Sequence, residues 1–359
     1  PGPIHRRIIF MKKRMIAALM AASMVASLAA CGSSKPAETT AASAETTAAA
    51  EAATEAAAAE TTAAAEATGK DASDVKIGIV TDVGGVNDGS FNQSAWAGLS
   101  KAADELGFQA SYLESHTDAD YKPNIETYID EDYDMIICIG YALADALKDE
   151  SAANPDMKFS IVDDASLADA SNVTSLMFEQ AQASYLVGYV AGKTTKTNTV
   201  GIVLGMATDL MNQFGYGYVA GAVDANPDCK VLQNNANSFA DTAAGKTAAN
   251  NMVAQGADVI FHAAGGTGLG VIDGCKEAGI WAIGVDSDQS GIIDEFKDGL
   301  TVTSAMKGLS TTVDTLLTAI KAGEWKDYVG KIDNLGLVSE NPEDNFVQLP
   351  MDTTQWADG

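Results

Sequence analysis

The body of the chain alternates short apolar segments with longer amphipathic ones, and it does so twice, before and after the polar stretch 194–199. Short runs rich in valine and isoleucine predict strands, and segments with apolar residues at helical spacing predict helices. The predicted strands are 75–81, 108–113, 133–139, 158–162, 173–178, 200–204, 230–232, 258–262, 280–285 and 300–303. The predicted helices are 91–106, 122–129, 141–151, 180–193, 211–223, 240–254, 269–277 and 309–321. Because apolar strands alternating with helices are typical of parallel sheets covered on both sides, we predict an α/β protein with two doubly wound parallel-sheet lobes.

The first 31 residues have the pattern of an export signal and are not expected to join the fold. Three basic residues at 12–14 precede the apolar stretch 15–26, which is shorter than the ~20 residues that a membrane-spanning helix needs. Leu28-Ala29-Ala30-Cys31 then matches the bacterial lipobox, so we expect cleavage before Cys31 and lipidation of its thiol. An ordinary secretory signal with a chance cysteine is the alternative. Residues 1–10 precede Met11 and are interpreted as translated upstream sequence.

Residues 32–73 are expected to form a disordered tether. They are almost entirely alanine, threonine, glutamate and serine, without aromatic or branched aliphatic side chains, so they cannot bury enough apolar surface to offset their chain entropy. A long helix is the alternative, since alanine and glutamate favour one. For the remaining chain we expect one lobe from 74–198 plus about 305–325, and a second from 199–304 plus about 326–359.

Composition excludes several classes of function. Cleavage before Cys31 leaves 17 basic and 49 acidic residues, a formal charge of −32, which argues against nucleic acid as a partner. No second apolar segment of 18 residues or more follows, so contact with the membrane is expected only through the lipid anchor. The other cysteines, Cys138, Cys229 and Cys275, are odd in number and lack C-x-x-C spacing, which argues against a metal site or disulfide framework. A Cys229–Cys275 bridge stays open.

Short carboxylates and glycines recur directly after the predicted strands of both lobes. In open α/β sheets ligands bind outside the carboxyl ends of the strands, so these positions are candidates for a site. Each one alone could be a helix cap or turn residue, but their recurrence in both lobes indicates a shared binding cleft. The candidates are Asp82 and the turn to Asn92, Gly140 and Tyr141, Asp163 and Asp164, Gly265 and Gly266, and Asp286 to Asp288.

The segment 75–98, which includes the candidate turn from Asp82 to Asn92, closely resembles the opening of the basic membrane protein family of lipoproteins. Its core is Asp82-Val-Gly-Gly-Val-Asn-Asp-Gly-Ser-Phe91-Asn92-Gln-Ser-Ala-Trp96, and the resemblance continues through Tyr112-Leu-Glu-Ser, Ala144-Asp-Ala, Asp163-Asp164, His262-Ala-Ala-Gly-Gly-Thr-Gly268 and Ile283-Gly-Val-Asp286-Ser-Asp288-Gln289. It covers about 75–330. These lipoproteins are solute-binding proteins of ABC transporters and include purine nucleoside receptors. The resemblance implies a type I periplasmic-binding-protein fold, with two lobes joined by a hinge and the ligand between them.

The resemblance also implies roles for individual residues. Phe91 corresponds to an aromatic residue that stacks on the nucleobase, with Asp82 and Asn92 beside it. Phe214 is the expected second aromatic face, although Met211-Asn212-Gln213-Phe214 departs from the His-Arg-Phe-type segment usual in the family. The remaining candidates are Asp163 at the base edge, Asp286 at the ribose hydroxyls, Lys307 near the sugar, and Tyr141, Gly265, Gly266 and Asp288 at the cleft.

The sequence therefore predicts an extracytoplasmic, lipid-anchored binding protein that passes a nucleoside to an ABC permease. We expect a monomer without cofactor, metal or catalytic residues. The alternatives are a binding protein for a flavin or another nucleoside-like solute, and a dinucleotide-dependent enzyme. The enzyme is suggested by a glycine-rich turn after 258–262 with Asp286 twenty residues beyond Gly266, which imitates a dinucleotide-binding βαβ unit. Its position in the second lobe of an exported protein argues against that interpretation.

Overall fold

The predicted alternation of strands and helices is present in the computed structural model, which describes residues 71–294, 301–309, 311–313, 317, 332–341 and 344–354. The predicted export signal, Cys31, nearly all of the predicted tether and most of the predicted helix 309–321 lie outside the described residues. Within the described ranges, none of the helices combines the length and apolarity that a membrane span requires.

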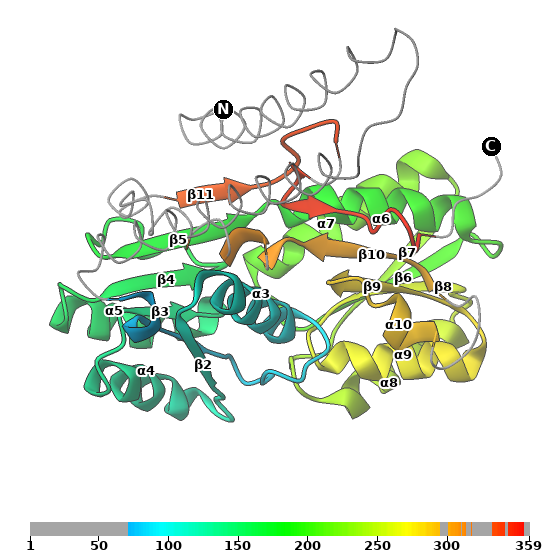
Figure 1. Cartoon of the computed structure of the whole chain (residues 1–359). Coiled ribbons are helices and arrows are strands. Elements are labelled where there is room, and N and C mark those ends of the chain that lie inside the picture. The colour runs from blue at the N-terminus through cyan, green and yellow to red at the C-terminus, as the bar shows by residue number, and fades with distance from the viewer. Residues whose placement is uncertain are drawn as a thin grey trace, which may run out of the picture. The chain divides into compact units, whose positions relative to one another are not determined.

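The first lobe is built on a six-stranded parallel sheet with the strand order β11-β5-β4-β3-β1-β2 (Figure 1). Its strands are β1 (Lys76–Val80), β2 (Gln109–Leu113), β3 (Met135–Cys138), β4 (Lys158–Val162), β5 (Val173–Phe178) and β11 (Ile332–Leu335). Its α-helices are α3 (Phe91–Leu106), α4 (Tyr121–Asp130) and α5 (Ala144–Ala153), and short 3-10 turns lie at Ala72–Asp74, Asp118–Asp120 and Tyr141–Leu143. β3 is buried along its whole length. Its side chains belong to the core of this lobe, together with residues of α4 and α5.

The second lobe is built on a six-stranded sheet with the order β12-β10-β9-β8-β6-β7, in which only β12 is antiparallel. Its strands are β6 (Thr199–Leu204), β7 (Lys230–Asn235), β8 (Val259–Ala263), β9 (Trp281–Asp286), β10 (Thr301–Lys307) and β12 (Val347–Gln348). Its helices are α6 (Gln180–Thr194), α7 (Asp209–Ala225), α8 (Thr242–Ala254), α9 (Thr267–Ala278) and α10 (Ser290–Asp294). Helices α6 and α7 lie on one face of this sheet, and α8 and α9 lie on the other (Figure 1).

The division of the chain between the lobes differs from the expected one. The structure places β11 in the first sheet, paired with β5, although residues after about 326 were expected in the second lobe. It places β10 through Lys307 in the second sheet, beside β9, although 305–325 was expected in the first lobe. Helix α6 packs against α7 and β10 rather than completing the first lobe. The chain therefore passes from one lobe to the other after Phe178, between β10 and β11, and between β11 and β12.

Glycines explain why α6 packs in the second lobe. Helices α6 and α7 each contain the sequence Gly-Tyr-Val-Ala-Gly, at 188–192 and 217–221. A Cβ at Gly217 would lie 2.2 Å from the carbonyl oxygen of Ala181, and a Cβ at Gly221 would lie 2.0 Å from that of Tyr185. The two helix backbones are therefore in direct contact, an approach that only glycine permits. This packing fixes α7, whose first turns face the cleft described below.

Candidate ligand-binding site

Residues that follow strands of both sheets line one cavity. The lining residues are Asp82, Gly84, Asp88, Phe91, Gly140, Tyr141, Ala142 and Asp163 from the first lobe, and Leu210, Met211, Phe214, Phe239, Ala263, Ala264, Gly265, Val285, Asp286 and Lys307 from the second.

The first-lobe wall is held by hydrogen bonds around the start of α3. The buried carboxylate of Asp82 follows β1, and its Oδ1 accepts from the side-chain amide of Asn92 at 2.7 Å and from the N–H of Gly84 at 2.8 Å. The Asp88 carboxylate accepts from the backbone N–H groups of Asn92 at 2.9 Å and Gln93 at 3.1 Å, so it caps the free donors at the start of α3. These contacts fix the first turn of α3, which presents Phe91 to the cavity.

Asp163 and Asp286 occupy equivalent positions in the two lobes. Asp163 follows β4 and Asp286 ends β9, and both have left-handed backbone conformations, with φ of 62° and 64°. Few residues other than glycine adopt this conformation, but aspartate and asparagine tolerate it, and such outliers gather at functional sites. Both side chains are buried and line the cavity. The fold therefore places one short carboxylate from each lobe on opposite sides of the same space.

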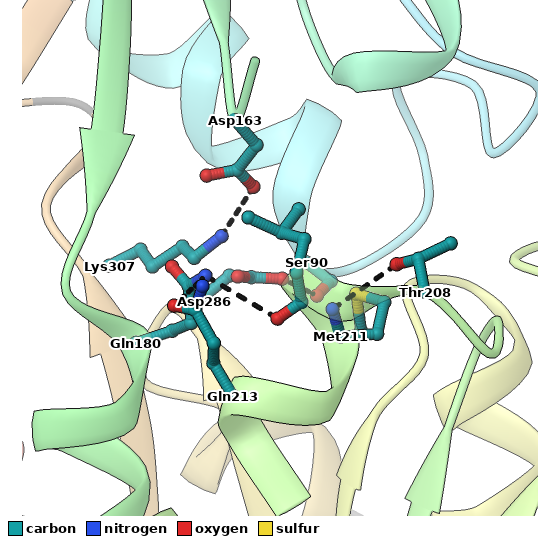
Figure 2. A network of polar contacts seen from close by, with 9 residues as sticks. Ser90, Asp163, Gln180, Thr208, Met211, Gln213, Asp286 and Lys307 are labelled. Atoms are coloured by element: carbon teal, nitrogen blue, oxygen red, sulfur yellow. Dashed lines mark hydrogen bonds and ion pairs between the residues drawn. The ribbon is translucent and has the colours of Figure 1, made fainter. Parts of the chain in front are cut away.

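The ammonium group of Lys307 lies beside the Asp163 carboxylate and close to three aromatic rings. Its Nζ donates to Asp163 Oδ2 at 2.5 Å, and only 4% of its side chain is exposed (Figure 2). The rings of Phe91, Phe178 and Phe214 have their centroids 5.1, 5.5 and 5.3 Å from Nζ, within cation–π distance. Because Lys307 ends β10 and Asp163 follows β4, the ion pair joins the two lobes.

Burial shifts the acidity of the cavity carboxylates. Desolvation raises the pKa of Asp82 from 3.8 to about 6, against the hydrogen bonds from Asn92 and Gly84. Desolvation likewise raises the pKa of Asp286 to about 6, and the Lys307 ammonium and the Ser90 hydrogen bond oppose this shift. Both groups would become protonated in mildly acidic solution, and they would then lose part of their capacity to accept hydrogen bonds.

The lobes also touch each other around the cavity. The Ser90 hydroxyl at the start of α3 donates to Asp286 Oδ2 at 2.5 Å (Figure 2). The ring of Tyr141 lies edge-on to that of Phe239, with centroids 6.4 Å apart. The structure therefore shows the two lobes closed against each other around this cavity.

Eight of the eleven predicted site residues line the cavity: Asp82, Phe91, Tyr141, Asp163, Phe214, Gly265, Asp286 and Lys307. The other three do not. Asn92 lies behind Asp82 and orients it, and Gly266 lies beside the lining residue Gly265 without lining the space itself. Asp288 is exposed and accepts from the Ser290 N–H at 3.0 Å and the Thr353 hydroxyl at 2.7 Å.

Several lining residues were not among the predicted site residues: Asp88, which lies in the candidate turn from Asp82 to Asn92, and also Leu210, Met211 and Phe239. Phe239 lies in the loop after β7, so inspection of the residues that follow each strand would have found it if the predicted strand had not ended at 232. Asp88 precedes the predicted helix by three residues, a spacing that indicates a cap but not a cavity. In the segment that departs from the family pattern, Met211 lines the cavity whereas Gln213 accepts from the Gln180 side chain at 3.0 Å (Figure 2).

Comparison with known proteins identifies the family. The sequence model of the Bmp family, described as ABC transporter substrate-binding protein PnrA-like, matches residues 75–340. The chain belongs to the Bmp family. The resemblance found in the sequence is thereby confirmed, and a small-molecule ligand and a permease partner follow from membership. Since the family consists of transport binding proteins, the binding interpretation is favoured over the dinucleotide-dependent enzyme.

Two relatives of this Bmp family protein are similar over most of their length. A "CD4+ T-cell-stimulating antigen" of Listeria innocua is 44% identical over 276 residues, which are 71% of this chain and 76% of the relative. An "ABC transporter nucleoside-binding protein BmpA" of Lactococcus lactis is 37% identical over 302 residues, which are 79% of this chain and 84% of the relative.

Solved structures confirm the fold of the Bmp family protein. An ABC transporter solute-binding protein from Aeropyrum pernix matches with a TM-score of 0.69 and 26% identity, over 77% of this chain and 76% of that chain. A solute-binding protein from Burkholderia graminis, in complex with D-arabinose, matches with a TM-score of 0.59 and 16% identity, over 80% of this chain and all of that chain. The predicted periplasmic-binding-protein fold, with two parallel-sheet lobes joined by a hinge, is confirmed.

The raised pKa of Asp82 makes a prediction about the ligand-free protein. Above pH 6 the Asp82 carboxylate is charged in both the folded and the unfolded state, but only the folded state buries that charge. Asp82→Asn should therefore stabilise the protein at pH 8 by up to roughly 3 kcal/mol. The asparagine Oδ1 can still accept from Gly84. As pH falls from about 6 towards the ordinary value of 3.8 the wild-type carboxyl takes up a proton in the folded state and this penalty decreases, so the gain should be smaller at pH 5.

Thermal unfolding at both pH values checks this prediction. Asp104→Asn on the exposed face of α3 is the matched control and should have little effect at either pH. An equal gain for Asp82→Asn at pH 8 and pH 5 would contradict burial of the charge as the cause.

Proposed function

We propose that this Bmp family protein captures a purine nucleoside between its lobes and delivers it to an ABC permease. The observation that carries the proposal is the pairing of aromatic rings and carboxylates across the cavity. Phe91 and Phe214 come from opposite lobes and both line the cavity near Lys307 Nζ, with Asp163 and Asp286 on either side. The Lactococcus lactis relative, which is named as a nucleoside-binding protein, supports the same ligand class.

Each part of a nucleoside has a matching group in this cavity. A base between two aromatic faces gains about 1–3 kcal/mol per stacking contact. Asp163 Oδ1 is buried and has no hydrogen-bond partner among the described residues, so it is available to accept from a purine N–H. We assign Asp286 to the ribose hydroxyls, because a carboxylate can accept from a pair of neighbouring hydroxyls.

The charge of the cavity favours a nucleoside over a nucleotide. Four carboxylates line it, those of Asp82, Asp88, Asp163 and Asp286, against the single ammonium of Lys307. A phosphate group would add negative charge to a site that already carries an excess of it, and like charges in a buried site repel strongly. A neutral ligand rich in N–H and O–H donors fits this arrangement.

Titration calorimetry with inosine, guanosine, adenosine and cytidine tests the proposal, with riboflavin and guanosine monophosphate as comparison ligands. We expect binding of the purine nucleosides, weaker binding of cytidine and of the monophosphate, and no release of free base during prolonged incubation. Binding of riboflavin alone would identify the flavin alternative, and release of free base would identify a hydrolase. Failure of every nucleoside to bind would overturn the proposal.

We further propose that the protein is held on the extracytoplasmic face of the cell membrane through a lipid on Cys31. Cys31→Ser should abolish membrane association and leave ligand affinity unchanged, because about 40 residues separate Cys31 from β1. An acidic chain has no electrostatic attraction to anionic lipids that could replace the anchor. Fractionation of cells after a high-salt wash measures the effect, with Cys229→Ser as the control. If Cys31→Ser still sediments with membranes, the anchor lies elsewhere.

A further inference from the structure

A further contact between the lobes lies outside the ligand cavity, on the loop that connects β1 to α3. Gly89 in this loop belongs to the first lobe, and its carbonyl oxygen accepts from the side-chain Nε2 of Gln289 in the second lobe at 2.8 Å. Gln289 is completely buried, and neither residue lines the cavity. The contact therefore joins the lobes without touching the space that the ligand would occupy.

The orientation of the Gln289 side chain is fixed by its own lobe. Its Oε1 accepts from the backbone N–H of Val285 at 2.9 Å, and an amide turned the other way would set its NH₂ against that N–H. Its backbone N–H donates to the Ser304 hydroxyl at 3.1 Å. With Oε1 held by Val285, the NH₂ group can point only toward the first lobe. Gln289 is thus prepared to bind Gly89 before the lobes meet.

A hydrogen bond from His262 stabilises the same orientation of the Gln289 amide. Its Nε2 lies 2.9 Å from Gln289 Oε1, so it donates to this oxygen and carries its proton on Nε2. The ring is completely buried, and burial lowers the pKa of His262 to about 4, so it is neutral at physiological pH. A Cβ at Gly268 would lie 2.0 Å from its Nδ1, so the Gly268 backbone packs directly against the ring and restrains it.

The loop residue Gly89 fits closely into the second lobe. It has a φ of +66°, and a Cβ built on it would lie 3.1 Å from Cδ1 of Ile292 and 3.2 Å from Cδ2 of Leu269. A Cβ at this position would require the ends of the Ile292 and Leu269 side chains to move by a few tenths of an ångström. The contact between the loop and the second lobe therefore favours glycine at position 89, and it uses a Gln289 amide that its own lobe already orients.

We propose that Gln289 is an interlobe latch: it captures the Gly89 carbonyl when the lobes close, and it sets how slowly bound solute is released. The proposal rests on the proposed function in one respect, that solute is captured by closure of the lobes. Because the latch stabilises the closed arrangement of the lobes and does not contact the ligand, its loss should raise the dissociation rate and leave the association rate nearly unchanged. Gln289 is a positioning residue, since it contacts the other lobe and not the ligand.

Gln289→Glu tests the latch with a minimal change. The carboxylate can still accept from Val285 and His262, but it cannot donate to the Gly89 carbonyl. In stopped-flow measurements with inosine we expect release to be about tenfold faster or more, since a buried carbonyl loses its donor. The association rate should stay within about twofold of wild type.

Gly89→Ala tests the latch from the opposite side and has a closely matched control. Gly89 lies just before helix α3, and Gly107 directly follows the same helix. Gly107 has a φ of +79°, and a Cβ built there has no atom within 4 Å. Gly89→Ala and Gly107→Ala therefore share the cost of a left-handed alanine, and only Gly89→Ala meets the second lobe. We expect faster release from Gly89→Ala and wild-type release from Gly107→Ala. Equal release rates in all the variants and wild type, or equal increases in Gly89→Ala and Gly107→Ala, would overturn the latch.

Hydrogen exchange separates failure of the latch from failure of the proposed ligand class. If wild-type protein binds no nucleoside, the nucleoside proposal fails, and exchange of the amides in 84–90 is measured on the full chain without ligand. The latch predicts faster exchange of this loop in Gln289→Glu than in wild type, with Val285 still protected by the retained acceptor. Identical exchange of the loop in both proteins would overturn the latch on its own.

Discussion

Replacement of Lys307 by methionine should destabilise the ligand-free protein by about 3–5 kcal/mol at pH 8, because it removes one partner of a buried ion pair. Methionine keeps most of the apolar stem but leaves the Asp163 carboxylate without its cation, with only 6% of that side chain exposed. The Lys307 charge also lowers the pKa of Asp286, so the variant would carry two uncompensated carboxylates in one cavity.

The loss should depend on pH with a definite sign. Without Lys307 the pKa of Asp286 rises further above its unfolded value, so the folded state binds more protons than the unfolded state in mildly acidic solution. The destabilisation is therefore fully present above the raised pKa and is relieved as pH falls through it. Unfolding by urea at pH 8 and pH 5 should show a smaller difference between variant and wild type at pH 5.

Lys246→Met provides a control with similar pairing but more exposure. Lys246 lies 2.7 Å from both Asp273 Oδ2 and Glu277 Oε1, and 34% of its side chain is exposed, against 4% for Lys307. Ion pairs near the surface contribute about 0–1 kcal/mol, so this variant should lose little. The double variant Lys307→Met with Asp163→Asn should recover part of the loss. If Lys307→Met lowers the free energy of unfolding no more than Lys246→Met does, Lys307 does not stabilise the fold by compensating buried carboxylates.

The strands and helices themselves were largely predictable because each satisfies a local rule. The predicted helix 91–106 and the predicted strands 158–162 and 173–178 have the bounds of α3, β4 and β5. β4 and β5 are buried at almost every position and their sequences are mostly apolar, and α3 is followed by Gly107, the usual left-handed cap. The end of β10 extends four residues past the predicted 303, and its last residue, Lys307, lines the cavity, a position that no local pattern reveals.

The assignment of elements to lobes was not predictable in the same way. The segment Ile332-Asp-Asn-Leu335 is four residues long and half polar, and it forms β11 only because β5, more than 150 positions earlier in the chain, offers it an edge. Likewise α6 joins the second lobe because its glycines fit the backbone of α7. The first outcome depends on a partner distant in sequence and the second on a close fit between two helix backbones, and hydrophobic periodicity carries no information about either.

The candidate site was predictable where it follows strand ends and not where it depends on lobe closure. Asp82, Asp163 and Asp286 all follow or end parallel strands, and all three line the cavity. Asp288 satisfies the same rule but points to solvent, because the chain turns into α10 at Ser290. The Lys307–Asp163 ion pair joins the lobes, so only the closed arrangement reveals it.

Phe91→Leu should weaken every nucleoside by a similar factor, because each base has an aromatic face and stacking does not distinguish among them. The expected loss is about 1–3 kcal/mol, which corresponds to about five- to 150-fold in affinity. Phe178→Leu is the matched control: its ring lies 5.5 Å from Lys307 Nζ, against 5.1 Å for Phe91, but Phe178 does not line the cavity. A loss in Phe91→Leu alone indicates stacking, whereas equal losses would indicate an effect through Lys307.

Asp163→Asn should instead change the order of affinities among nucleosides. The substitution can set an NH₂ donor where Oδ1 now has no partner, opposite a purine N–H, so purines with a donor there should lose more than cytidine does. Some loss common to all ligands is also expected, because the ion pair with Lys307 is removed as well. Titration calorimetry with inosine, guanosine, adenosine and cytidine separates the two effects, since only recognition of the base edge alters their ranking. If all four weaken equally, Asp163 holds Lys307 and the lobes in place without contacting the base.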